Sequence, residues 1–257
     1  MRLSQNHLFF SLSTYIVLTS AVSLPTSFIL TGDSTTAVPS GWGNGFCGSS
    51  TPAIASSLET GTPCFNVAVG GATTGSFVNQ GHWKTALDLA KAEVAKGRRT
   101  LVTIQFGHND RWVGTPDLLA QHLTPMVQQV KEIKAEPILI TSLVVRTFDS
   151  TGKKIIEDTL APYVAATIQV AENEKTHLLD LHEKSLTYCE AIGVTAANKF
   201  NPAAGDTTHV NQKGMVVFGR MVADLMNADF GLIGINLLPI VPNPELSYNI
   251  THGIPSY

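Results

Sequence analysis

The chain has 257 residues, of which 44% are hydrophobic and 14% are charged. This composition supplies enough apolar side chains for a core and excludes a globally disordered protein, while the length favours one large domain. The formal net charge is −3, from 17 basic and 20 acidic residues that form no long runs. Nucleic acid is therefore not expected as a partner.

The first 23 residues have the pattern of a secretory signal peptide. Arg2 provides a basic start, residues 8–22 are mostly apolar, and Ala21-Val22-Ser23 has the small residues of a signal-peptidase site. A membrane anchor is the alternative, but a spanning helix needs about 20 apolar residues, and this shorter stretch also contains several Ser and Thr residues. We therefore expect a secreted, extracellular protein that has no membrane contact once residues 1–23 are cleaved.

Short apolar runs alternate with longer amphipathic segments along the remaining chain. In chain order, the pattern predicts strand 27–31, strand 65–69, helix 82–96, strand 101–106, helix 117–134, strand 137–145, helix 160–174, strand 176–181, helix 185–192 and helix 211–226. This alternation predicts a three-layer α/β/α sandwich around a parallel five-stranded sheet. From about residue 228 the pattern ends in a proline-rich segment, and we expect an extended tail on a single domain of residues 24–257.

Three cysteines in a secreted chain allow one disulfide and leave one thiol. We favour the pair Cys47 and Cys64, which flank a Gly- and Ser-rich stretch, because closing that loop would stabilise the fold by about 3 kcal/mol. Cys189 lies in an apolar helical pattern and is expected to be a buried thiol. No metal site is expected, since no zinc-type spacing occurs. Asn249 begins the only N-glycosylation sequon and predicts a surface position.

Ligands of an open parallel sheet bind beyond the carboxyl ends of its strands. Ser34 follows the first predicted strand there, and Asp206 and His209 precede the last predicted helix. Each alone is weak, since a serine after a strand is more often a helix cap. Together, the carboxylate can hold one ring nitrogen of His209 while the other nitrogen faces the Ser34 hydroxyl, as nucleophilic catalysis requires.

Asn109 follows the third predicted strand and supplies a side-chain donor. With the backbone N–H groups of Ser34 and Gly71, it can surround the oxyanion of a tetrahedral intermediate, where removing one donor costs about 2.7–4 kcal/mol. A simple turn in the polar segment around Asn109 is the alternative. These three residues are predicted to form the oxyanion hole.

The four blocks taken together resemble the SGNH hydrolases, also called GDSL-type esterases. The blocks are Gly32-Asp33-Ser34, Gly71 within residues 66–72, Gly107-His108-Asn109-Asp110, and Asp206-Thr207-Thr208-His209. The resemblance implies a flavodoxin-like fold and ester hydrolysis without a metal or organic cofactor. It also implies that Ser34 is the nucleophile, His209 the general base and then acid, and Asp206 the orienting acid.

Within that family, residues 104–110 and Gly41-Trp42-Gly43 are similar to the rhamnogalacturonan acetylesterase branch. Thr35 stands where the family motif has Leu, as is usual for this branch. The resemblance implies a secreted carbohydrate esterase that removes acetyl groups from a plant cell-wall polysaccharide, with rhamnogalacturonan or pectin as substrate. We expect a monomer.

Two further residues are predicted to lie near the substrate. Trp112 follows the third block by three residues, and its flat ring suits a pyranose face, whereas Trp42 and Trp83 are expected in the core. His108 is predicted either to line the pocket or to support it through a hydrogen bond.

Two alternative functions stay open. One is a lipase or short-chain carboxylesterase of the same superfamily. The other is a carbohydrate-binding protein on a hydrolase scaffold, which the presence of competent residues at all catalytic positions disfavours.

Overall fold

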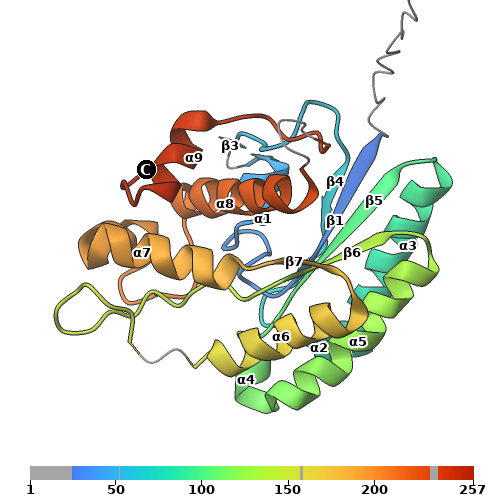
Figure 1. Cartoon of the computed structure of the whole chain (residues 1–257), viewed down its shortest axis with the longest axis horizontal. Coiled ribbons are helices and arrows are strands. Elements are labelled where there is room, and N and C mark those ends of the chain that lie inside the picture. The colour runs from blue at the N-terminus through green and yellow to red at the C-terminus, as the bar shows by residue number, and fades with distance from the viewer. Residues whose placement is uncertain (1–24, 52, 157–158, 232–236) are drawn as a thin grey trace, which may run out of the picture.

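The structure, a computed structural model, describes residues 25–51, 53–156, 159–231 and 237–257. The predicted signal peptide at residues 1–23 lies outside this part of the chain. A central sheet carries helices on both of its faces (Figure 1). This architecture confirms the predicted three-layer α/β/α sandwich.

The central sheet has five parallel strands in the order β4-β1-β5-β6-β7. They are β1 (Thr26–Gly32), β4 (Cys64–Asn66), β5 (Arg99–Gln105), β6 (Glu136–Ile140) and β7 (His177–Leu179). After β4 the chain crosses back over β1 to β5, so the winding direction reverses beside β1. Such a reversal opens a crevice at the carboxyl ends of the two central strands. A separate antiparallel pair joins β2 (Ser49–Ser50) and β3 (Ala53–Ile54).

The strands contribute side chains to two hydrophobic cores, one on each face of the sheet, because successive residues of a strand point to opposite faces. Phe28 and Leu30 of β1 belong to one buried cluster and Ile29 to the other. The first cluster packs under α1 (Gly43–Cys47), α7 (Leu181–Ala197), α8 (Gln212–Phe230) and α9 (Pro244–Thr251), and the second under α2 (Thr74–Asn79), α3 (His82–Ala95), α5 (Pro116–Glu132) and α6 (Ala161–Glu174). Figure 1 shows these two groups on opposite sides of the sheet, with the short α4 (Asp110–Val113) beside the second.

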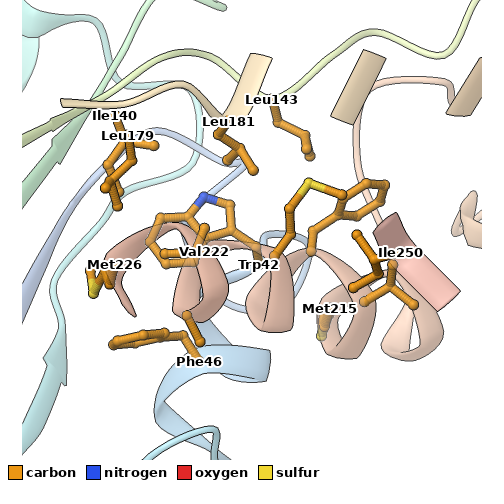
Figure 2. Close-up of a cluster of buried hydrophobic side chains, with 14 of the residues drawn as sticks. Trp42, Phe46, Ile140, Leu143, Leu179, Leu181, Met215, Val222, Met226 and Ile250 are labelled. Atoms are coloured by element: carbon orange, nitrogen blue, oxygen red, sulfur yellow. The ribbon is translucent and has the colours of Figure 1, made fainter. Parts of the chain in front are cut away.

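Trp42 anchors the first core. Its indole lies in a cluster with Leu181 and Val222, next to helix α8 (Figure 2). The ring is fully buried, and its Nε1 donates to Oε1 of Gln105 at 2.9 Å. Because the ring is buried and its polar atom is paired, Trp42 acts in packing, as the sequence predicted.

Cys47 and Cys64 form the predicted disulfide, with their Cα atoms 5.5 Å apart. It joins the end of α1 to the first residue of β4. Cys189 is a free and fully buried thiol in α7, as expected. Burial raises the pKa of this thiol to about 12, so it stays protonated at neutral pH.

The C-terminal segment differs from the predicted extended tail. Helix α8 continues to Phe230, and α9 follows at Pro244–Thr251. Asn243 caps α9 by accepting from the backbone N–H of Leu246 at 3.2 Å, and Pro244 occupies the first turn, where its missing N–H costs nothing. The expected surface sequon at Asn249 therefore lies in a helix, half-buried. None of the helices in the described part of the chain is long and apolar enough to cross a bilayer.

Candidate active site

Ser34 lies directly beyond the carboxyl end of β1, in a tight turn. The backbone carbonyl of Asp33 accepts from the N–H groups of Thr36 and Ala37 at 3.1 and 2.9 Å. A Cβ at position 32 would approach the Gln105 carbonyl oxygen to 2.6 Å, so only glycine fits where the chain leaves the strand. This turn leaves Ser34 half-buried at the carboxyl end of β1.

His209 reaches Ser34 from the loop before α8. Its Nε2 lies 2.9 Å from the Ser34 Oγ, and its Nδ1 lies 3.0 Å from Oδ2 of Asp206. With Nδ1 donating to the carboxylate, the neutral ring accepts the Ser34 proton at Nε2. The structure thus brings together the three residues that the sequence assigned to nucleophile, base and orienting acid.

Asp206 holds both the ring and the backbone of its loop. Its Oδ1 accepts from the backbone N–H groups of Thr208 and His209 at 3.1 and 2.9 Å. Partial burial acts to raise the pKa of Asp206, but the hydrogen bonds from His209 and Thr208 outweigh it, and the pKa falls below its ordinary value. The carboxylate is therefore ionised at neutral pH and can stabilise a positive charge on His209.

Of the two predicted oxyanion donors outside the Ser34 turn, Gly71 belongs to a loop that passes beside Ser34, and Asn109 bonds to that loop. Gly70 precedes Gly71, and a Cβ at position 70 would lie 3.9 Å from that of Ser34. Gly71 has φ +77°, a left-handed conformation that favours glycine. Asn109 donates from Nδ2 to the Ala72 carbonyl oxygen at 3.0 Å, which leaves its second amide hydrogen for another acceptor.

Asp110 also joins the loop after β5 to the segment that follows Gly71, a role that the sequence did not predict. Its Oδ1 accepts from the backbone N–H and the hydroxyl of Thr74 at 3.0 and 2.6 Å. The Thr74 hydroxyl in turn lies 2.8 Å from Nδ1 of His122 on α5. Burial raises the pKa of Asp110. The position of Asp110 directly after Asn109 is the only sequence signal for this role.

A buried polar network lies beneath Ser34. Oδ1 of Asp33 accepts from the backbone N–H and hydroxyl of Thr35 at 2.9 and 2.8 Å. Oε1 of Gln105, at the end of β5, accepts from Thr36 Oγ1 and from Trp42 Nε1. Burial raises the pKa of Asp33 to about 6, while the Thr35 hydrogen bonds act in the opposite direction. The sequence signal for this network is Gln105 itself, because a polar side chain in a buried strand requires hydrogen-bond partners.

His108 is buried, which does not fit its predicted place on the pocket wall, and its supporting role stays a prediction. The side chain is only 3% exposed, and the Leu143 backbone interacts with its ring. Gly107 has φ +132° and passes so close to Ser142 that no side chain fits there, and His108 follows this turn inward. Burial lowers the pKa of His108 to about 3, while the Leu143 backbone acts to raise it, so the ring is neutral. It does not line an open surface.

Trp112 is 72% exposed, with the Arg111 guanidinium 4.6 Å above its ring. The guanidinium covers one face of the ring, so a sugar would stack on the opposite face. Within the described residues, no group of three or more His, Cys, Asp or Glu side chains is arranged to hold a metal ion.

Comparisons with known proteins identify the family. The model of the GDSL-like lipase/acylhydrolase family matches residues 30–217. Rhamnogalacturonan acetylesterase RhgT of Bacillus subtilis (strain 168) is 30% identical over 222 residues, which cover 78% of this chain and 89% of that protein. The probable rhamnogalacturonan acetylesterase YesY of the same organism is 29% identical over 202 residues, 75% of this chain and 84% of that protein.

Solved structures share the fold. The crystal structure of YxiM from Bacillus subtilis has a TM-score of 0.64 at 24% identity; the match covers 80% of this chain and 57% of that chain, just over half its length. Axe2, an acetylxylan esterase from Geobacillus stearothermophilus, has a TM-score of 0.55 at 16% identity and covers 84% of this chain and 99% of that one. Since the family match spans most of the chain, the chain belongs to the GDSL-like lipase/acylhydrolase family and is a carboxylic ester hydrolase.

Proposed function

We propose that this chain is a secreted esterase that removes acetyl groups from a plant cell-wall polysaccharide, with rhamnogalacturonan as the preferred substrate. The observation that carries the proposal is the continuous contact from Asp206 through His209 to the Ser34 hydroxyl. This arrangement suits acyl transfer, in which a serine is activated by a base that a third group orients.

In the proposed first half-reaction, His209 Nε2 takes the Ser34 proton as Oγ attacks the acetyl carbonyl carbon. The carbonyl oxygen becomes an oxyanion, which the backbone N–H groups of Ser34 and Gly71 and the Asn109 amide stabilise. When the intermediate collapses, the ester C–O bond breaks, His209 protonates the leaving sugar oxygen, and an acetyl-Ser34 ester remains.

In the second half-reaction, water replaces the sugar hydroxyl. His209 accepts a proton from the water as its oxygen attacks the acetyl carbon, and it returns the proton to Oγ when acetate leaves. Asp206 stays ionised throughout and stabilises the imidazolium at Nδ1. One ester and one water thus give one free hydroxyl and one acetic acid, which ionises to acetate and a proton in solution.

The choice of substrate rests on two supports. RhgT and YesY are named as rhamnogalacturonan acetylesterases, and each matches at least three quarters of this chain. The exposed ring of Trp112 offers a flat apolar face for a sugar near the third block. Secretion is supported by the pattern of residues 1–23 and by the disulfide, which is typical of proteins from oxidising compartments.

Acetate release tests the proposal. Purified protein is incubated with acetylated rhamnogalacturonan, acetylated xylan, acetylated homogalacturonan and a triglyceride, with Ser34→Ala as the inactive control. We expect the highest kcat/KM on rhamnogalacturonan and a loss of several orders of magnitude in Ser34→Ala. A preference for the triglyceride would favour a lipase, and activity in Ser34→Ala above a tenth of wild type would contradict the assigned nucleophile.

A further inference from the structure

Arg146 contacts three consecutive carbonyl groups of the loop that carries Asp206 and His209. Its backbone N–H donates to the Thr207 carbonyl oxygen at 2.9 Å. Its guanidinium donates from Nη2 to the His209 carbonyl oxygen and, at the long limit of 3.5 Å, from Nη1 to that of Thr208. One side chain therefore donates hydrogen bonds to the carbonyl oxygens of His209 and of the residue before it.

The guanidinium is buried in an unusual setting for a cation. The side chain is 1% exposed. Burial lowers the pKa of Arg146, while the charge of the Asp206 carboxylate acts in the opposite direction. The other partner of the guanidinium is Asn201, whose Oδ1 accepts from Nε and Nη2 at 3.2 and 2.9 Å. The ring of Phe218 lies 6.0 Å from the guanidinium carbon. Burying a charge is costly unless its hydrogen bonds are met, so this arrangement requires the loop carbonyls as acceptors.

The loop has few other long-range ties. The side chains of Asp206 and His209 are each about one-third exposed, and they contact each other and, through His209, the Ser34 hydroxyl. The Thr207 hydroxyl lies 3.0 Å from that of Thr147, and the next residue after His209 donates its N–H to the Ser40 carbonyl oxygen at 2.9 Å. Arg146 thus provides a buried support for this loop, through the carbonyl oxygens of Thr207, Thr208 and His209.

We propose that Arg146 is a positioning residue for ester hydrolysis: by holding the carbonyls of Thr208 and His209, it keeps the imidazole within reach of the Ser34 hydroxyl. This inference rests on the proposed function of Ser34, His209 and Asp206. A guanidinium suits the role because its planar donors can bridge several acceptors at fixed angles, which a lysine ammonium cannot do. Since its side chain is almost fully buried, Arg146 does not contact substrate.

Two substitutions at this position test the proposal. Arg146→Met keeps much of the buried volume and removes all side-chain donors, whereas Arg146→Lys keeps a charge and a single donor group. On a small acetyl ester, we expect kcat of Arg146→Met to fall about 100-fold, as a misplacement near 1 Å can cause, with KM within about twofold of wild type. The kcat of Arg146→Lys should lie between those of wild type and Arg146→Met. The rate of Ser34 sulfonylation by phenylmethanesulfonyl fluoride should fall in parallel with kcat.

A purely structural role would lower the thermal midpoint but leave kcat per folded molecule unchanged, and that result would overturn the proposal. If Arg146→Met fails to fold, Asn201 decides the matter. Asn201→Asp keeps an acceptor for the guanidinium and should retain near-wild-type kcat, whereas Asn201→Leu removes it and should lower kcat. Equal kcat in these two variants would overturn the proposal.

Ser34→Ala, measured beside these variants, distinguishes a failure of the proposed catalytic site from a failure of the positioning role of Arg146. Loss of activity in Ser34→Ala with wild-type kcat in folded Arg146→Met overturns only the positioning role. Persistent activity in Ser34→Ala overturns the proposed site itself. Loss in both, with the parallel fall in sulfonylation, supports both.

Discussion

The Asn109 side chain donates a hydrogen bond to the backbone carbonyl of Ala72 at 3.0 Å, and so joins the loop after β5 to the loop after β4. The amide that is proposed to bind the oxyanion is therefore held in place by the loop that provides the second donor, Gly71. The orientation of this amide is set before substrate arrives, which is the condition for electrostatic stabilisation without reorganisation.

Replacing Asn109 should weaken stabilisation of the oxyanion. In Asn109→Ala we expect kcat on a small acetyl ester to fall about 100- to 1,000-fold, corresponding to about 2.7–4 kcal/mol, with the acid limb of the pH–rate profile unmoved. Asn109→Asp, which keeps the shape and loses the donor, should fall comparably. A change of less than fivefold in both variants would remove Asn109 from the oxyanion hole.

Replacing His209 should change the shape of the pH profile as well as the rate. His209→Ala removes the group that accepts the Ser34 proton, so kcat should fall by several orders of magnitude and the acid limb should disappear. His108→Gln is the matched control. Because burial lowers the pKa of His108 to about 3, its replacement should leave the acid limb in place. An acid limb that persists in His209→Ala would mean that another group is the base.

Asp33 should make the stability of the protein depend on pH. Burial raises its folded-state pKa from 3.8 to about 6, so between these values the folded protein holds a proton that the unfolded chain has released. The stabilisation from this group is complete below pH 3.8, declines as the pH rises and is lost above about 6, a change of about 3 kcal/mol at most. Urea denaturation at several pH values should show this decline in wild type and a smaller one in Asp33→Asn.

Asp88→Asn, which removes an exposed acid on α3, is the control for that measurement and should retain the wild-type decline between pH 4 and 6. If Asp33→Asn follows the wild-type curve over this interval, the proton is not held by Asp33.

The cysteines should differ sharply in reactivity. A digest of the non-reduced protein should contain the linked Cys47 and Cys64 peptides, and reduction should destabilise the fold by about 3 kcal/mol. Cys189 should resist alkylation in the native protein and react after unfolding, because burial raises its pKa to about 12 and denies access. Rapid alkylation of native Cys189 would contradict its buried position.

The parallel sheet and the four motif blocks were predictable because each depends on residues close together in sequence. The apolar runs predicted five strands, and the glycine and polar clusters after them marked the crevice where Ser34 and Asn109 lie. The short α1 and α4 were missed, since four or five residues show too little periodicity to predict a helix. Helix α9 was missed because Pro244 reads as a breaker unless its place in the first turn is known.

The supports of the site were not predictable from local patterns. Arg146 and the His209 carbonyl that it holds are 63 residues apart, and Asp33, Thr36 and Gln105 meet only once β1 and β5 pair. For His108, by contrast, a neighbouring position in the sequence was misleading. Its position beside Asn109 suggested a place in the pocket, but the turn at Gly107 directs its ring into the protein interior.

The disulfide has a consequence for how the sheet meets other chains. Both edge strands, β4 and β7, are only three residues long, so the sheet offers few unpaired backbone groups to a neighbouring molecule. The inner strand β1 is seven residues long and apolar, and β4 covers one of its sides. By tethering β4 through Cys64, the disulfide keeps this aggregation-prone strand from becoming an edge on which further chains could add.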